Sequence, residues 1–189
     1  LHFSFIFSQE READNVRHMS FYPTEQNGKW FFTNLMDSTN QTNNLYDTIY
    51  FCSNQYNPIY FIAVKDQNFD FFDSQLKRIT TGKISKFLCT ENDLFIKWQK
   101  DWTRYNFSEN KLSTFQADSI VNINNLVYVY HQNKVGLITE SSFIPPSYYR
   151  LIPFKDHKQD YEKSLLLTLE KGKYGLIDYT GKTIIQTIA

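Results

Sequence analysis

The sequence lacks the features that mark nucleic-acid and membrane proteins. Its 20 basic and 20 acidic residues give a formal net charge of zero. It therefore carries no excess of positive charge with which to bind phosphate backbones or an anionic membrane surface. No apolar run approaches the roughly 20 residues needed to span a bilayer. We predict no nucleic-acid partner and no membrane insertion of the mature domain.

Patterns typical of catalytic and metal sites are also missing. The histidines, His2, His18, His131 and His157, stand far apart and show no zinc-ligand spacing. The sequence has no nucleophile elbow, no phosphate-binding loop and no dinucleotide glycine pattern. We expect no enzymatic activity, no cofactor and no metal. A propeller-type enzyme remains the least supported alternative.

The acidic residues occur mainly in turn-like segments. The carboxylates that could converge as a glycosidase pair are Glu91, Asp93, Asp101 and Glu109. All four are expected in solvated loops. The segment KDQNFDFFD, with Asp66, Asp70 and Asp73, comes nearest to a calcium loop, which needs several carboxylates at alternating positions. We expect these three residues in a turn and on the solvent face of a strand.

Cysteine is scarce. Cys52 and Cys89 both lie in apolar, strand-like contexts, IYFCSN and KFLCTE. Two buried free thiols are the preferred interpretation, and one disulfide is the alternative.

The N-terminal stretch LHFSFIFSQ is apolar and precedes the charged stretch EREADNVRH. It is either an ordinary first strand or the tail of a secretory signal that is cleaved near Ser8. We expect residues 1–20 to form a poorly ordered leader or signal remnant. The expected location is the periplasm, the cell surface or the extracellular space, with the cytoplasm as the alternative.

Aromatic residues are abundant, with 17 Phe, 13 Tyr and 3 Trp. Such side chains favour strands and bury large areas, while the frequent Asn suits turns. No 3.6-residue periodicity is sustained after residue 20. The sequence therefore predicts an all-β protein of short strands.

A unit near the C-terminus recurs along the chain. KGKYGLID (171–178) matches QNKVGLIT (132–139), with weaker copies at 26–32, 66–73 and 99–106. The equivalent anchor residues are Trp30, Phe69, Trp102, Val135 and Tyr174. They give a period near 36 residues, which is typical of repeat architectures. We expect repeats near 26–64, 65–98, 99–131 and 132–170, and a partial one at 171–189.

Each of the last four anchors follows an alternating apolar segment and a short polar turn, which is the pattern of a β-hairpin. The apolar segments are IYFIAV (59–64), LFIKW (94–98), LVYVY (126–130) and SLLLTL (164–169). About five units of 33–39 residues, each with three to four short antiparallel strands, are expected to form one domain over 21–189. A β-propeller-like arrangement is preferred, and an open β-solenoid or curved sheet is the alternative.

Some repeat positions have a physical interpretation. Gly136 and Gly175 are expected where a neighbouring repeat approaches so closely that a Cβ would clash. Pro145–Pro146 excludes a central strand and favours an edge strand or a connection.

Asp178 and Gly181 fit a turn in which the carboxylate accepts backbone N–H groups and glycine takes a positive φ. Asp73 and Asn106 can serve the same turn in earlier copies.

The segment GKYGLIDYTGKTIIQ resembles the bacterial WG-repeat family, whose units read roughly GKWGyID-x-x-G-K-x-x-I-P-P-x-Y-D. The match is strongest at 171–182 and 133–154. LYDTI (45–49) is similar to the Tyr-Asp element, and NGKW (27–30) to the opening of a unit. Trp-Gly itself never occurs, and the Tyr-Asp element of the fourth copy is Tyr149–Arg150. The resemblance covers about residues 26–189 and implies an extracytoplasmic or surface module with no general set of catalytic residues.

One aromatic group could bind a ligand. Trp98 and Trp102 bracket the turn in KWQKDWTRY, with Arg104 and Tyr105 beside them. Alternatively, Trp102 is the core anchor of its repeat and Trp98 packs on its partner strand. The function we expect is a non-catalytic repeat module that mediates protein–protein interaction in the bacterial envelope or outside the cell. A carbohydrate-binding module that uses exposed aromatics is the alternative, so the partner is a protein or a glycan.

Overall fold

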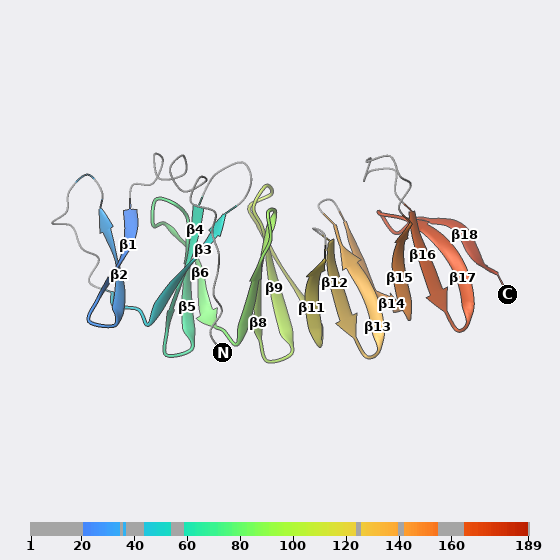
Figure 1. Ribbon diagram of the computed structural model, residues 1–189, viewed down its shortest axis with the longest axis horizontal. Helices are drawn as coiled ribbons and strands as arrows, with labels where there is room; N and C mark the ends of the chain where they lie inside the picture. Colours follow the sequence, from blue (N-terminus) through green and yellow to red (C-terminus); the bar gives the residue numbers. More distant parts are fainter. Residues whose placement is uncertain are drawn as a thin grey trace. The chain divides into compact units, whose positions relative to one another are not determined.

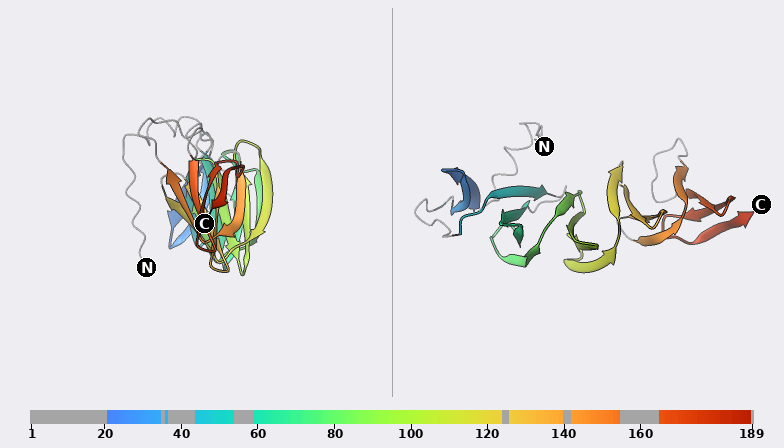
Figure 2. Two further views of the ribbon diagram at one scale, coloured as in Figure 1. Left: turned by 90° about the vertical axis from the view of Figure 1, so that its right-hand side faces the viewer. Right: turned by 90° about the horizontal axis from the view of Figure 1, so that it is seen from below.

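The computed structural model describes residues 21–34, 36, 44–53, 59–123, 126–139, 142–154 and 165–188. Every regular element in these ranges is a β-strand, as the composition predicts (Figures 1 and 2). Within the described ranges, no helix is long and apolar enough to cross a membrane. The predicted leader, residues 1–20, lies outside the described residues.

The strands of the N-terminal half of the chain have the following bounds: β1 Phe21–Gln26, β2 Lys29–Asn34, β3 Thr48–Ser53, β4 Ile59–Lys65, β5 Asn68–Phe72, β6 Arg78–Lys83, β7 Lys86–Cys89, β8 Asp93–Trp98 and β9 Asp101–Asn106. The remaining strands are β10 Lys111–Gln116, β11 Ser119–Ile123, β12 Leu126–His131, β13 Lys134–Ile138, β14 Phe143–Tyr148, β15 Arg150–Phe154, β16 Leu165–Glu170, β17 Lys173–Asp178 and β18 Thr183–Ile188.

These strands form five small sheets. β1 and β2 make a two-stranded sheet, and β3–β6, β7–β10, β11–β14 and β15–β18 each make a four-stranded sheet in chain order. A four-stranded meander is the form of a propeller blade. The fold class is therefore all-β and β-propeller-like, built from repeated sheets.

The described strands form two compact units within the range for which the sequence predicts one domain. The first contains the described residues up to Gln99 together with Arg104–Leu112. The second contains Lys100–Thr103 and the described residues from Ser113 onward.

The five anchors occupy equivalent places. Each is the second residue of its strand: Trp30 in β2, Phe69 in β5, Trp102 in β9, Val135 in β13 and Tyr174 in β17. The repeat boundaries, however, cut through the sheets. The predicted partial repeat 171–189 supplies β17 and β18, the last two of the four strands in the sheet β15–β18.

The turns before the anchors explain why these hairpins form. Two residues connect the strands, and both take a positive φ in Asn27–Gly28, Asp66–Gln67, Gln132–Asn133 and Lys171–Gly172. This is the conformation of a type I′ turn, whose twist matches that of the flanking antiparallel strands.

Aromatic side chains dominate the core of the first unit. Tyr60 of β4 stacks on Phe107, with their ring centroids 4.6 Å apart, and Phe71 of β5 stacks on Tyr60 at 5.4 Å. Phe32 of β2 meets Phe61 of β4 edge to face at 5.1 Å. Fully burying one such side chain stabilises a fold by about 1.5–3 kcal/mol. Packing between adjacent sheets therefore holds the unit together.

In the second unit, the core joins the sheets β11–β14 and β15–β18. Leu137 and Ile144 of the first sheet pack in one cluster with Leu166 and Ile177 of the second. The backbone of Gly181 also comes close to Ile144, because a Cβ on this glycine would lie 3.3 Å from Ile144 Cγ1.

Gly136 has a different role from the one the sequence suggests. A Cβ at this position would lie 2.7 Å from the carbonyl carbon of Pro145 and 2.7 Å from Pro146 N. The approaching chain is β14, the edge strand of the same sheet, where the register shifts between Val135 and Leu137. The expected approach of a neighbouring repeat is thus wrong for Gly136. The edge position expected for the two prolines is confirmed.

Gly175 is buried and lies at a comparable register shift, between Tyr174 and Leu176.

Hydrogen bonds correct the alignment of the Tyr-Asp element that the sequence suggests. The N–H of Asp47 donates to β4 at 2.8 Å, and the N–H of Tyr149 donates to β16 at 2.9 Å. Tyr148–Tyr149, and not Tyr149–Arg150, therefore matches Tyr46–Asp47.

Candidate functional site

The predicted aromatic surface does not form. Trp102 is buried, and its indole N–H donates a hydrogen bond to the Ala117 carbonyl at 3.2 Å. Tyr105 is buried as well, and its hydroxyl lies 2.9 Å from Asn110 Oδ1. Both rings are core side chains and cannot stack on a ligand. This corrects their assignment as binding residues, and Trp102 is the core anchor of its repeat, as the alternative interpretation of the sequence has it.

Trp98 and Arg104, the other two candidates, are also engaged within the protein. Trp98 is half-buried, and the Lys83 ammonium lies 5.3 Å from the centroid of its ring, within cation–π range. Arg104 faces Asp93 at the start of β8. The role predicted for Arg104 as a ligand-binding residue is therefore replaced by a structural one.

Asp93 is the acidic residue whose place differs most from the prediction of a solvated loop. Its side chain is 5% exposed and accepts two hydrogen bonds from the Arg104 guanidinium, at 2.8 Å and 3.0 Å. Asn106 Nδ2 donates a third, at 2.9 Å. A buried carboxylate is tolerated only when it is paired and hydrogen-bonded in this way. The segment TENDLF gave no sign of this burial because it has the composition of a turn.

A second repeated position follows each anchor by four residues. It is occupied by Asn34, Asp73, Asn106, Thr139 and Asp178. Each side-chain oxygen accepts a backbone N–H from the turn that follows. Gly181 in the last of these turns has φ +88°. These residues therefore close turns, as the Asp178–Gly181 pattern predicts.

Asp178 is the best-developed example of this turn. Its Oδ1 accepts hydrogen bonds from Thr180 Oγ1 at 2.6 Å and from the backbone N–H groups of Thr180 and Lys182, both at 2.9 Å. The hydroxyl of Thr180 is the main reason that the pKa of Asp178 lies below its ordinary value. Asp73 likewise accepts hydrogen bonds from the backbone N–H groups of Gln75 and Lys77.

Among the described residues, no group of three or more His, Cys, Asp or Glu side chains could hold a metal ion.

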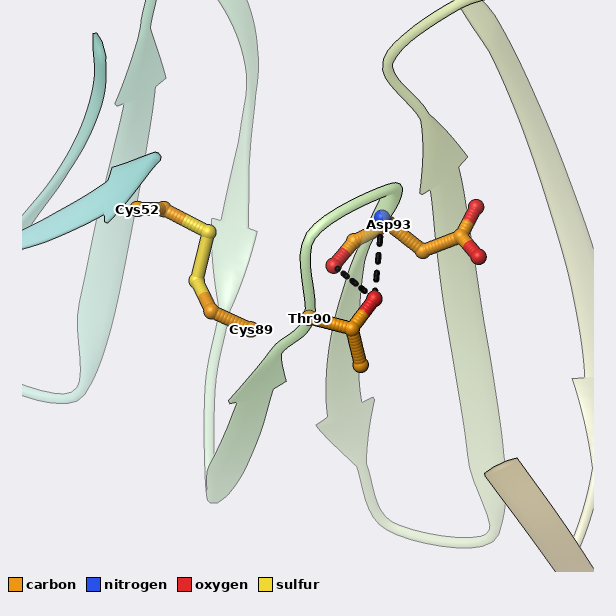
Figure 3. The surroundings of a disulfide bond; sticks show 4 residues. All are labelled: Cys52, Cys89, Thr90 and Asp93. Atoms are coloured by element: carbon orange, nitrogen blue, oxygen red, sulfur yellow. Dashed lines mark hydrogen bonds between the residues drawn. A yellow bond between two sulfur atoms is a disulfide. The ribbon is translucent and has the colours of Figure 1, made fainter. Parts of the chain in front are cut away.

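The two cysteines form a disulfide, which corrects the expectation of two free thiols. Cys52 of β3 is bonded to Cys89 of β7, with their Cα atoms 5.8 Å apart (Figure 3). The bond joins strands of two different sheets, and both strands lie in the first unit. Next to Cys89, the Thr90 hydroxyl donates a hydrogen bond to the backbone carbonyl of Asp93 and accepts one from its backbone N–H (Figure 3). The covalent link and the buried ion pair therefore lie on the same stretch of chain.

A pocket of 340 Å³ opens on the sheet β3–β6. Ala63, Asp70 and Thr81 lie side by side on β4, β5 and β6 as cross-strand partners and line it together. The rim includes Lys65, Asp66, Asn68 and Arg78. The sequence predicts Asp70 in a turn or on the solvent face of a strand, whereas its side chain is 19% exposed and lines this pocket.

Tyr46 connects the pocket to the core. Its hydroxyl lies 3.0 Å from Asp70 Oδ2, while its ring packs edge to face on Phe32 and Phe72. Burial, followed by the negative charge of Asp70, raises the pKa of Tyr46 to about 12. Tyr46 therefore stays protonated at physiological pH and donates to the carboxylate.

Strand β11 is a second candidate surface, in the second unit. It lies at the edge of its sheet and reads Ser119-Ile-Val-Asn-Ile123. Val121 and Ile123 are 42% and 48% exposed. Natural edge strands usually carry charge, proline or a bulge that blocks further pairing. The described β11 has none of these, and its pairing with β12 is regular over its whole length.

No family model matches the sequence, and no curated protein matches it. Among solved structures, the chain is similar to Hsv2 of Kluyveromyces lactis, with 10% identity and a TM-score of 0.39 over 88% of this chain and 59% of that one. It is also similar to the Pan2 WD40 domain of Neurospora crassa, with 17% identity and a TM-score of 0.29 over 72% and 48%. The chain spans between 57% and 61% of the length of the Hsv2 structures it matches.

Proposed function

We propose that this chain is a non-catalytic repeat module that binds another protein in the bacterial envelope or outside the cell. The observation that carries the proposal is the exposed, uncharged edge strand β11. An edge strand presents unpaired backbone N–H and C=O groups, to which an extended segment of a partner can add as a further strand. Val121 and Ile123 supply apolar contacts on the face where Ser119 also lies.

The other edges of the four-stranded sheets are less suited to strand addition. β14 contains Pro145–Pro146 and a register shift, β15 begins with Arg150 and contains Pro153, and β18 pairs with two register shifts. β3 is tied to β7 by the disulfide and by contact of Tyr50 with Phe87, whose ring centroids are 4.8 Å apart. The remaining edges, β6, β7 and β10, each begin with a cationic residue, namely Arg78, Lys86 and Lys111. Among the edges of the four-stranded sheets, β11 is therefore the best suited to pairing with a strand of a partner.

The disulfide supports the proposed location. Such bonds persist in oxidising compartments such as the periplasm and the cell exterior, and they are rare in the cytosol. Membership of the WG-repeat family is part of the same proposal, supported by the residues at 171–182 and 133–154. A surface module is what that resemblance implies.

The test is retention of a protein from an envelope extract of the source organism on the immobilised full chain, with its disulfide intact. Elution is first with mixed soluble glycans and then with salt. The double variant V121K/I123K should lose the protein that the wild type retains. I184K/I185K is the matched control, because it adds the same charge to exposed positions of the bulged edge β18. Equal retention by V121K/I123K, or release by glycans, would contradict the proposal.

A further inference from the structure

The pocket on the sheet β3–β6 has an anionic floor. Small side chains flank Asp70 on both neighbouring strands, with Ala63 opposite it on β4 and Thr81 opposite it on β6. The hollow above the carboxylate exists because neither neighbour is long enough to fill it. Its volume of 340 Å³ lies within the range of pockets that bind small molecules or side chains.

The carboxylate of Asp70 has capacity for further hydrogen bonds. Oδ2 accepts from Tyr46, and Oδ1 lies 3.5 Å from Nη1 of Arg78. A carboxylate offers about four lone-pair sites, and charge-assisted hydrogen bonds prefer about 2.7–2.9 Å. Arg78 is 60% exposed and is therefore a loosely held cation at the rim.

The charge distribution selects the class of ligand. The enclosed charge is the negative one of Asp70, while Arg78 and Lys65 are exposed at the rim. An anion would meet Asp70 at close range. A neutral sugar would find no exposed aromatic face in the lining, because the rings of Tyr46 and Phe69 are buried. A cation can instead replace Arg78 at Asp70 with shorter hydrogen bonds.

We propose that this pocket receives the guanidinium group of an arginine side chain from a partner protein. A planar guanidinium presents paired N–H donors that match the two oxygens of a carboxylate, which an ammonium group cannot do. The guanidinium of Arg78 in the same chain already contacts Asp70, at the long distance of 3.5 Å between Nη1 and Oδ1. The source of the arginine rests on the proposed function, whereas recognition of the guanidinium by Asp70 does not.

The experiment is a titration of the full chain with N-acetyl-L-arginine amide, followed by NMR of the backbone amides of Asn68, Asp70 and Thr81. We expect saturable shifts with a dissociation constant on the order of 1 mM. N-acetyl-L-citrulline amide is the matched probe, since it has nearly the same shape without the charge, and it should produce no saturable shift. Asp70→Asn should weaken arginine binding at least tenfold, whereas Asp101→Asn, at an exposed carboxylate of β9, should leave it unchanged.

Arg78→Ala gives the sharpest result. It removes the internal competitor, so arginine binding should tighten severalfold. Weaker binding in Arg78→Ala would mean that Arg78 contacts the ligand directly, and it would overturn the proposal. Equal shifts with citrulline, no saturable shift at all, or shifts produced instead by neutral sugars would also overturn it. Arginine binding that persists when no partner protein is retained would leave this site standing and remove only the proposed function.

Discussion

The guanidinium of Arg104 donates two hydrogen bonds to the carboxylate of Asp93, from Nε to Oδ1 at 2.8 Å and from Nη2 to Oδ2 at 3.0 Å. Both side chains are largely buried, with exposed fractions of 14% and 5%. Removing one partner of such a pair leaves an uncompensated buried charge, which is far more costly than losing a surface contact.

We therefore predict that Arg104→Met destabilises the fold by about 3–5 kcal/mol, measured by urea unfolding of the oxidised protein. Arg78→Met is the matched control, because its ion pair with Asp70 is long and largely exposed, and it should cost less than about 1 kcal/mol. Similar losses in the two variants would show that burial does not set the strength of the Asp93 pair.

The disulfide between Cys52 and Cys89 spans 37 residues of sequence. A cross-link of this length removes conformational freedom from the unfolded chain, worth about 3–4 kcal/mol in the chain-entropy model. We predict that reduction, or the double change C52S/C89S, lowers the free energy of unfolding by about 2–4 kcal/mol. Thiol titration of the untreated, denatured protein should detect no free thiol. Detection of two thiols would contradict the pairing.

Gly136 should be intolerant of any side chain. A Cβ there would press against the carbonyl oxygen of Ile144 and the backbone of Pro145–Pro146, none of which can rotate away. Gly136→Ala should therefore destabilise the second unit by about 2–4 kcal/mol in thermal unfolding. Gly82→Ala is the milder comparison, because its nearest atom is a ring carbon of Phe69 at 3.3 Å. Equal tolerance at both glycines would argue against the close approach of β14.

The type I′ turns predict a pair of opposite effects. Gln67 holds a φ of +62°, which is strained for a residue with a Cβ, so Gln67→Gly should stabilise the protein by about 0.5–1 kcal/mol. Gly172 has φ +79° and no atom within 4 Å of a built Cβ, so Gly172→Ala should destabilise it by about 1 kcal/mol through backbone strain alone. Chemical denaturation of both variants measures the sign of each change in the free energy of unfolding. The same sign in both would contradict the turn assignment.

Alkaline pH should weaken the first unit. Burial raises the pKa of Tyr46 to about 12, from the 10.0 of an exposed tyrosine. The folded state therefore holds this proton more tightly than the unfolded state. The resulting stability is complete below pH 10 and is lost as the pH rises toward 12. Denaturation midpoints measured across this window should fall less steeply in Tyr46→Phe, and an unchanged slope would contradict the role of Tyr46.

Much of the fold could be predicted from local sequence because turn chemistry and alternation are local properties. The dipeptides Asn27–Gly28 and Lys171–Gly172 indicate type I′ hairpin turns. The spacing of Trp30, Phe69 and the later anchors locates the equivalent strand of each sheet. The grouping of strands into sheets could not be obtained this way. Hairpin turns identify which strands are adjacent, but they do not show where one sheet ends and the next begins.

The site residues were harder to predict because burial depends on neighbouring sheets. Asp93 follows a turn-like segment and gives no local sign that Arg104 lies opposite it. Cys52 and Cys89 belong to different sheets, so pairing them requires knowing that β3 and β7 are neighbours. Asp70 occupies the position that is Gly136 in a later repeat, and its small cross-strand partners Ala63 and Thr81 leave it at the floor of a pocket.

Hydrogen–deuterium exchange of the full chain, measured with and without its retained partner protein, tests the central claim most directly. Alternate backbone N–H groups of an edge strand lack a partner within the sheet and exchange quickly. If a partner adds to this edge, exchange at Ser119–Ile123 should slow strongly on binding, while β18 stays unchanged. Protection confined to other strands, with unchanged exchange across β11, would contradict the account.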